Sequence, residues 1–269
     1  MDPKEFKKIV YSYYKTHGRH SLPWRKTVNP YKILVSEVML QQTQADRVAL
    51  KFRSFIKKFP TVRALAKAPL REVLLSWQGL GYNRRALYLK KMAEAVTKKY
   101  KGKIPSSLLE LETLPGIGPY TARAVRAFAL NEPEVFIETN IRTVYLHHFF
   151  ADKDKVRDEL LIPLIKKTLD QKNPREWYSA LMDYGSHLKK TVPNPSRRSH
   201  AHVKQSAFKG SVREVRGKIL ALVMREGAVS LSKVKKELAV LGKDKITRAL
   251  SALIREGLIS QKGTSITTK

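Results

Sequence analysis

Apolar residues recur at helical spacing along most of the chain. In the first segment Phe6, Ile9, Val10, Tyr13 and Tyr14 are separated by three or four positions, which places them on one face of an amphipathic helix. Further helical segments are predicted at 31–43, around Leu65, and at 70–77, 84–100 and 120–130. No strand pattern is convincing before residue 228, so the sequence predicts a mainly α fold.

Residues 211–269 carry a different arrangement of elements. Helices are predicted at 212–225, 232–238 and 244–255, the last with Asp244 as its N-cap. The sequence LISQKGTSITTK then alternates around Gly263, as in a small β-hairpin. Three helices followed by a hairpin resemble a winged helix-turn-helix. A three-helix appendage without a DNA-binding role is the alternative.

Residues 191–210 (TVPNPSRRSHAHVKQSAFKG) are polar, basic and nearly free of large aliphatic side chains. This composition is typical of a linker, or of a segment that becomes ordered only against the body of the protein or against DNA. We therefore predict three parts. They are a helical domain over 1–190, a basic linker over 191–210, and a winged-helix-like domain over 211–269.

The chain is strongly basic, with 53 Lys and Arg against 23 Asp and Glu and a formal net charge of +30. Lys and Arg side chains that lie against phosphates release condensed counterions, so this excess favours a polyanionic partner such as a nucleic acid. On charge alone, the alternatives are a basic protein without such a partner and one that associates with ribosomes or membranes.

Two features that the sequence lacks, a membrane or signal segment and cysteine, bear on the cellular location of the protein. The chain has no run of about 18 apolar residues, and its first residues form an amphipathic pattern unlike a signal peptide. It has no cysteine, which excludes disulfides, thiolate metal sites, thiol nucleophiles and cysteine-held iron–sulfur clusters. We therefore expect a cytoplasmic protein without a membrane partner, associated with the nucleoid when it is bound to DNA.

The segment LPGIGPYTA at 114–122 has two glycines separated by one residue, directly before a predicted helix. Their missing side chains allow a tight turn and let a phosphate approach backbone N–H groups where the helix dipole favours an anion. This is the helix-hairpin-helix pattern, which binds the DNA backbone without reading its sequence. In a basic helical chain it predicts DNA contacts at four residues, Leu114, Gly116, Ile117 and Gly118.

Several motifs together resemble the A/G-specific adenine DNA glycosylases (the MutY family) of the helix-hairpin-helix superfamily. They are LPWR at 22–25, SEVMLQQTQ at 36–44, GLGY at 79–82, LPGIGPYTA at 114–122 and ETN at 138–140. They follow the family's order over about residues 1–190, and SEVMLQQT separates the adenine glycosylases from their superfamily relatives. The resemblance implies a glycosylase fold of two helical subdomains, and double-stranded DNA with a mismatched or damaged base pair as the partner.

Cleavage of an N-glycosidic bond to adenine needs a proton for the departing base and negative charge beside the sugar. Glu37 lies in an apolar helical stretch, so burial should raise its pKa. The resemblance implies that Glu37 protonates the adenine and positions or activates water. Glu138 stands where the family has the aspartate of Asp-Gly-Asn, before a matching Asn140. Efficiency, target base and activity itself depend on how the extra methylene is accommodated.

Tyr120 stands where bifunctional members of the superfamily carry a Schiff-base lysine. Tyrosine cannot form that imine, so we expect base removal without strand cleavage. In some adenine glycosylases a tyrosine at this position orders the catalytic carboxylate through its hydroxyl. Ordinary packing is the alternative.

The remaining motif residues resemble groups that handle DNA. Arg25 resembles the residue beside the flipped adenine, with Asp183 as its acidic partner. Extrusion of a base leaves a hole and needs a wedge. Gln42 and Tyr82 resemble the family's intercalating side chains, and Thr43 with Gln42 would contact the opposite base. For each of these residues ordinary polar packing is the alternative.

The chain departs from the family in two larger ways. The family usually has four cysteines after residue 190 that bind an iron–sulfur cluster. This chain resembles the clusterless members, in which the basic 191–210 segment, with Arg197 and Arg198, would contact DNA instead. His200 and His202 make a poor zinc site without further ligands, so we expect no cofactor beyond a monovalent cation at the hairpin. The usual C-terminal domain, which reads the oxidised guanine, is replaced by the predicted winged helix.

We therefore expect a monomeric, monofunctional glycosylase that removes adenine opposite 8-oxoguanine or guanine. Two alternatives stay open. One is a glycosylase for another base, such as uracil, mismatched thymine or hypoxanthine, and the other is a non-catalytic DNA-binding protein. A buried Glu37 argues against the second alternative, because a carboxylate repels DNA and has little use in a pure binder.

Overall fold

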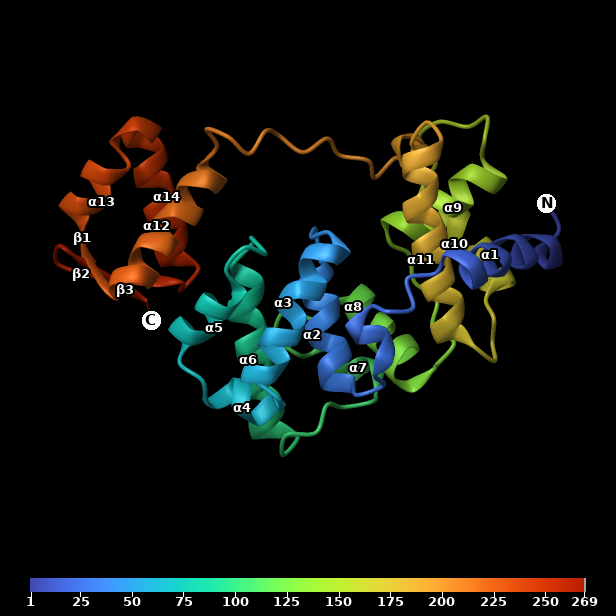
Figure 1. Cartoon of the computed structure of the whole chain (residues 1–269), viewed down its shortest axis with the longest axis horizontal. Helices are drawn as coiled ribbons and strands as arrows, with labels where there is room; N and C mark the ends of the chain where they lie inside the picture. The colour runs from blue at the N-terminus through green and yellow to red at the C-terminus, as the bar shows by residue number, and fades with distance from the viewer. Residues whose placement is uncertain (269) are drawn as a thin grey trace. The chain divides into compact units, whose positions relative to one another are not determined.

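The computed structural model describes residues 1–268 as a mainly helical chain, which confirms the predicted fold class (Figure 1). The residues divide into two compact units, each built from two stretches of the chain. The first unit comprises residues 1–37 and 104–204, and the second comprises residues 38–103 and the chain from residue 205 onward. The boundaries predicted at residues 190 and 210 stay a prediction.

The first unit packs around a cluster of aromatic rings. Phe6, from the apolar face predicted for the first helix, lies 5.2 Å from Tyr145 and 5.9 Å from Trp177 between ring centroids. All three side chains are fully buried, so each contributes about 1.5–3 kcal/mol of hydrophobic stabilisation. The elements of this unit are α1 (Pro3–His17), η1 (Pro23–Lys26), the start of α2 (Pro30–Leu40), α7 (Leu108–Glu112), α8 (Pro119–Val125), the π-helix η2 (Arg126–Leu130), α9 (Thr139–Phe149), α10 (Asp158–Thr168), α11 (Pro174–Thr191) and η3 (Pro195–Arg198).

In the second unit, residues 38–103 pack around the buried ring of Trp77. Phe55 approaches this ring edge-on, with 6.0 Å between centroids. The helices are the end of α2, α3 (Ala45–Lys58), α4 (Val62–Lys67), α5 (Leu70–Trp77) and α6 (Arg84–Lys99). The prediction that helix continues to Thr43 is wrong, because α2 ends at Leu40. Gln42 has a φ of +54°, in the left-handed region that a right-handed helix cannot contain.

The C-terminal part of the second unit has the predicted three helices and hairpin. Its elements are α12 (Val212–Glu226), β1 (Ala228–Ser230), α13 (Leu231–Glu237), η4 (Ala239–Leu241), α14 (Lys243–Arg255), β2 (Ile259–Lys262) and β3 (Ser265–Thr268). The strands form an antiparallel sheet in the order β1-β3-β2, with buried Val229 opposite buried Ile266. The sequence missed β1, because three residues are too short for an alternating pattern. Lys269, the end of the predicted hairpin segment, lies outside the described residues.

One capping prediction in this part is wrong. Gly242 is the N-cap of α14, with a φ of +92°, and Asp244 lies inside the first turn. A glycine is suited to this position because residues with side chains rarely adopt a positive φ. Asp244 still lies where a negative charge interacts favourably with the helix dipole.

The first half of the predicted 191–210 linker is ordered against the first unit. The Val156 N–H donates to the Arg198 carbonyl and the His200 N–H donates to the Val156 carbonyl, both at 2.9 Å. The Arg198 guanidinium donates to the carbonyl of Leu146 at 3.0 Å and to that of Ala151. Residues 202–207, by contrast, have no regular secondary structure. The basic segment therefore has an anchored half and a half without regular secondary structure.

Because Arg198 is bonded to backbone carbonyls and Arg197 is exposed, we expect the two residues to contribute differently to stability. Arg198→Ala leaves two backbone carbonyls without their partner, and we expect the free energy of unfolding to fall by about 1–3 kcal/mol. Arg197 is exposed, so Arg197→Ala is the matched control and should change it by no more than about 0.5 kcal/mol. Urea denaturation followed by circular dichroism measures both. Equal effects of the two substitutions would contradict the anchoring role.

Candidate active site

Glu37 is a carboxyl group buried in the apolar stretch of α2. Leu34 and Val35 beside it are fully buried, and Glu37 itself is only 5% exposed. The Tyr120 hydroxyl donates a hydrogen bond to Glu37 Oε2 at 3.1 Å. Burial raises the pKa of Glu37 to about 7; the Tyr120 hydrogen bond lowers it, and the charge of Glu138 raises it. Glu37 can therefore hold a proton near neutral pH.

Tyr120 reaches Glu37 from the first turn of α8, directly after the glycine hairpin. Its ring packs edge-on against Phe136, with 5.7 Å between centroids. Burial raises the pKa of the Tyr120 hydroxyl well above its ordinary value, and the charges of Glu37 and Glu138 raise it further. The hydroxyl therefore stays protonated and acts as a hydrogen-bond donor.

Glu138 is the N-cap of α9, and its carboxylate folds back onto the first turn of that helix. Oε1 accepts from the Asn140 N–H at 2.7 Å and from the Ile141 N–H at 2.8 Å. Oε2 accepts from the Asn140 side-chain amide at 3.1 Å. Free N–H groups at a helix N-terminus favour a carboxylate both as hydrogen-bond donors and through the helix dipole. The Glu138 side chain therefore has a capping geometry that keeps its charge at the start of α9.

Two residues of α11 that the sequence did not single out approach the same place. A Cβ at Gly185 would lie 2.7 Å from the carbonyl carbon of Asn140, so only glycine lets α11 come this close to the start of α9. Lys189, one turn further along α11, interacts with the charge of Glu138. Burial lowers the pKa of the Lys189 ammonium, while Glu138 raises it. The Glu138 carboxylate therefore has Lys189 as a cationic neighbour, and no motif around residues 138–140 predicts this.

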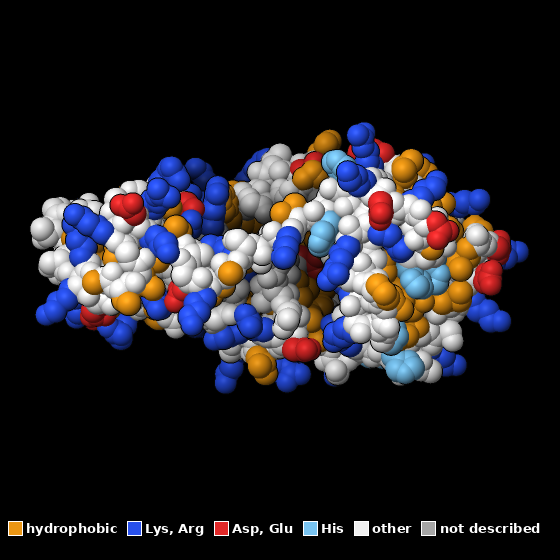
Figure 2. All heavy atoms as spheres, turned by 90° about the horizontal axis from the view of Figure 1, so that it is seen from above, with side chains coloured by type: hydrophobic (Ala, Val, Ile, Leu, Met, Phe, Trp, Pro, Cys, Tyr) orange, Lys and Arg blue, Asp and Glu red, His pale blue; other side chains and the backbone are white. Residues whose placement is uncertain are grey.

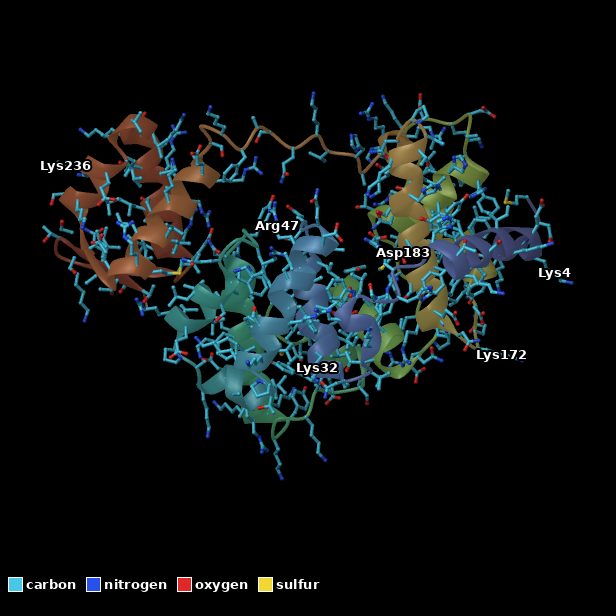
Figure 3. The ribbon with its side chains drawn as sticks, in the orientation of Figure 1. Lys4, Lys32, Arg47, Lys172, Asp183 and Lys236 are labelled. Carbon is cyan, nitrogen blue, oxygen red and sulfur yellow. The ribbon has the colours of Figure 1, made fainter. Side chains whose placement is uncertain are left out.

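Arg25 and Asp183 form the ion pair that the resemblance implied. The Arg25 guanidinium donates to both carboxylate oxygens of Asp183, at 2.5 and 2.9 Å. Arg19, which the sequence did not single out, adds its backbone N–H and its Nε, each at 2.7 Å. Asp183, labelled on α11 in Figure 3, has a side chain that is only 1% exposed.

The two buried carboxyl groups of the first unit have opposite electrostatics. Burial alone would raise the pKa of Asp183, but hydrogen bonds and charges from Arg25 and Arg19 lower it below its ordinary value. Glu37 has a hydroxyl donor instead and a raised pKa. Asp183 is therefore committed to its arginines, and Glu37 is the carboxyl group suited to proton transfer.

The glycine hairpin joins α7 to α8 as predicted. Gly116 has a φ of +78°, and Gly118 is the N-cap of α8 with free space where a Cβ would stand. Leu114 and Ile117 are 4% and 5% exposed, so their side chains belong to the core. DNA contacts at these two positions would have to use the backbone.

The predicted wedge residues lie on two turns of the second unit. Gln42 follows the end of α2 and is exposed, and Tyr82 precedes α6 and is 40% exposed. Both have left-handed backbones, with φ of +54° and +47°. Thr43 points its hydroxyl inward, to the Leu80 carbonyl at 3.2 Å. Gln42 and Tyr82 therefore protrude, whereas Thr43 connects the two turns.

On the face seen in Figure 2, Lys and Arg side chains are scattered widely and outnumber the acidic ones, in keeping with 53 Lys and Arg against 23 Asp and Glu in the chain. Arg197 is exposed, whereas the Arg198 guanidinium is bonded to backbone carbonyls. Within residues 1–268 no helix is both long and apolar enough to cross a bilayer. The same residues contain no group of three or more His, Asp or Glu side chains placed to hold a metal ion.

Comparisons with known proteins point to one family. Residues 35–165 match the family described as HhH-GPD superfamily base excision DNA repair protein. An adenine DNA glycosylase of Mycolicibacterium smegmatis is 33% identical over 264 residues, covering 91% of this chain and 89% of the relative. An adenine DNA glycosylase of Buchnera aphidicola is 35% identical over 185 residues, covering 67% of this chain and about half (52%) of the relative. The solved structure of a thermostable thymine-DNA glycosylase aligns with a TM-score of 0.60 and 26% identity, covering 68% of this chain and 86% of that one.

The helical body and its glycine hairpin thus define a protein of the HhH-GPD superfamily of base excision DNA repair proteins. Within that superfamily, the chain belongs to the adenine DNA glycosylase family, with which it aligns over nearly its whole length.

The raised pKa of Glu37 makes the stability of the protein depend on pH. The folded protein keeps the proton up to about pH 7, whereas an unfolded glutamate loses it near pH 4.5. The protonated Glu37 therefore contributes about 3 kcal/mol to the free energy of unfolding. This contribution is fully present below about pH 4.5 and is lost as the pH rises to about 7. Glu37→Gln lacks this loss. In urea denaturation from pH 4.5 to 8, the wild type should lose about that much relative to the variant. Parallel curves would contradict a buried, protonated Glu37.

Proposed function

We propose that the chain is a monofunctional DNA glycosylase that extrudes adenine opposite 8-oxoguanine or guanine and removes it by hydrolysis. The observation that carries this proposal is the arrangement of two unlike carboxyl groups. Glu37 is buried with a raised pKa under the Tyr120 hydroxyl, and Glu138 is held by the N–H groups of α9. One carboxyl group suits proton donation and the other suits charge stabilisation.

In the proposed reaction Glu37 gives its proton to the departing adenine. The bond between C1′ of the sugar and the base nitrogen breaks, and its electron pair leaves with the base. The Glu138 carboxylate stabilises the positive charge that develops on the sugar. A water molecule then adds its oxygen to C1′ and returns a proton to Glu37, so the enzyme is regenerated. Tyr120 holds the Glu37 carboxyl in position through its hydrogen bond.

The absence of strand cleavage follows from Tyr120. A lyase step needs an amine that forms an imine with C1′, and the hydroxyl of Tyr120 cannot supply one. The product is therefore an intact strand with an abasic site. It breaks only after treatment with alkali or heat.

The partner in this proposal is double-stranded DNA with a mismatched or damaged base pair, bound by a monomer in the cytoplasm and at the nucleoid. Support comes from the net charge of +30, the glycine hairpin, the exposed Arg197 and the winged-helix-like elements, where 13 Lys and Arg stand against 5 Asp and Glu in residues 211–269. Lys236, on α13 in Figure 3, belongs to this basic set. A monovalent cation at the hairpin stays a prediction. A cysteine-held iron–sulfur cluster does not fit, because the chain has no cysteine.

The second candidate function is removal of another base. The structural likeness to a thymine-DNA glycosylase favours thymine in mismatches, and uracil and hypoxanthine complete this class. The replacement of the family aspartate by Glu138 is the sequence feature that keeps this candidate. A non-catalytic DNA-binding role is disfavoured, because burying Glu37 costs stability above pH 4.5 and has no benefit in a pure binder.

A panel of labelled duplexes tests the proposed function. Adenine, uracil, thymine and hypoxanthine are each placed opposite guanine, 8-oxoguanine and other bases, and alkali-labile sites are scored under single-turnover conditions. We expect cleavage at adenine opposite 8-oxoguanine or guanine, and only after alkali. Glu37→Gln keeps the shape of the side chain but cannot deliver a proton, so its rate should fall by at least about 10²-fold with DNA binding preserved. A fully active Glu37→Gln protein would sink the assignment of the acid, and strand breaks without alkali would sink the monofunctional assignment.

Glu138 is tested by changing its charge and its length separately. Glu138→Gln keeps a capping oxygen but loses the charge, so base removal should slow by at least about 10²-fold with little change in unfolding temperature. Glu138→Asp keeps the charge and is itself a good N-cap, so its rate should stay within about tenfold of the wild type. Single-turnover kinetics and thermal unfolding measure the pair. Equal rates for Glu, Gln and Asp would show that Glu138 has no part in the chemistry.

A further inference from the structure

The two turns that carry the predicted wedge residues are backbone features that cost free energy. Gln42 and Tyr82 both adopt left-handed backbones, and a non-glycine residue in this region is held there by its surroundings. Tyr82 follows Gly79 and Gly81, which also have positive φ, of +89° and +70°. Something outside the turns must therefore fix their shape.

Arg85, in the first turn of α6, makes contacts with both turns. Its Nη1 donates to the carbonyls of Val38 and Met39, both at 2.8 Å, and to that of Gln41. These are the last carbonyls of α2 and the one directly before Gln42. Arg85 therefore caps α2 at its C-terminal end and fixes the start of the first turn.

The other nitrogen of the same guanidinium holds the second turn. Arg85 Nη2 donates to the Leu80 carbonyl at 3.0 Å and to the Gly81 carbonyl at 3.1 Å. It also donates to the Thr43 hydroxyl at 3.0 Å, and that hydroxyl in turn donates to Leu80. A single planar fork thus joins the residues on either side of Gln42 to the two residues before Tyr82.

Aromatic rings enclose the guanidinium. Its central carbon lies 5.3 Å from the centroid of the Trp77 ring and 5.6 Å from that of Tyr82, within the range of cation–π attraction. The Trp77 indole N–H donates to the Gly81 carbonyl at 3.1 Å, so the ring below Arg85 also holds the second turn. Burial lowers the pKa of Arg85 to about 10, which still leaves it charged at neutral pH.

The geometry also excludes a simpler role. Arg85 could be one more cation for DNA phosphates, but Nη1 and Nη2 have four N–H bonds and already serve six acceptors. The side chain is half-buried beneath the turns. Exposed cations such as Arg47 on α3 need no such arrangement to meet a phosphate.

We propose that Arg85 is a positioning residue that fixes the Gln42 turn and the Tyr82 turn as one rigid wedge for base extrusion. The proposal rests on the proposed function, because a wedge is needed only if a base is flipped. Arg85 acts through the two turns and contacts neither the reacting atoms nor the base. Lysine cannot replace it, since one ammonium with three donors cannot hold two turns in one plane.

Hydrogen–deuterium exchange of the free protein tests the positioning without any activity. Arg85→Lys should raise exchange at residues 41–44 and at residues 79–83 together, by about tenfold or more. Arg63→Lys is the matched control, because Arg63 also donates to a backbone carbonyl, that of Lys101, in the same unit. It should leave both turns unchanged. Wild-type exchange at either turn in a folded Arg85→Lys protein would overturn the proposal, even if the chain removed no base.

Base removal tests the consequence. Single-turnover removal should slow by about 10- to 100-fold in Arg85→Lys, since a displaced wedge misplaces the base, while the salt dependence of DNA binding stays unchanged. In a protein that already carries Gln42→Ala and Tyr82→Ala, Arg85→Lys should slow base removal by less than about threefold. The side chains that Arg85 positions are absent from that protein. The same fold-change in both backgrounds would overturn the proposal. A wild type without activity would refute the proposed function alone, because the exchange result stands by itself.

Discussion

The cost of removing charge from water organises the first unit. A buried carboxyl group must either find cationic partners or keep its proton, and this unit contains both solutions. Asp183 has two arginines and stays charged, whereas Glu37 has the Tyr120 hydroxyl and a pKa near neutrality. The difference between the two groups lies in their neighbours. It gives the unit one fixed negative charge, at Asp183, and one exchangeable proton, at Glu37.

Glu138 stands where the resemblance implied an aspartate, and its local structure shows where the longer side chain places its charge. A longer carboxylate would displace its charge if it extended from the helix start. Instead it curls back to accept from the Asn140 and Ile141 N–H groups. The Asn140 side-chain amide also donates to that carboxylate, and Gly185 lets α11 lie close to the start of α9. These contacts fix the Glu138 side chain, and its charge stays at the start of α9.

Periodicity and motifs predicted the features that depend on neighbours in sequence. The first helix, α5, α6, the C-terminal helices and hairpin, the glycine turn at Gly116 and Gly118 and the burial of Glu37 follow from local patterns. The sequence patterns did not locate α3, α7, α10 or α11. The missed residues act across long separations. Arg19 joins Asp183, Lys189 faces Glu138, and Arg85 connects turns about forty residues apart. A lone arginine or lysine in a chain with 53 of them carries no local signal of its partner.

Some arginines of this basic chain are bonded within the protein itself. Like charges repel, and this repulsion destabilises a compact basic protein. A cation that is hydrogen-bonded to acceptors within the protein destabilises it less than a cation that has only other cations nearby. Arg85 donates to carbonyls in the last turn of α2, and Arg198 donates to a carbonyl in the last turn of α9. The helix dipole is negative at these C-terminal ends, so it favours a cation there. Between residues 191 and 210, Arg198 and the pairing of Val156 with residues 198–200 hold the chain in place. Part of the positive charge therefore has a structural role. The exposed cations, such as Arg197, stay available to interact with a polyanion.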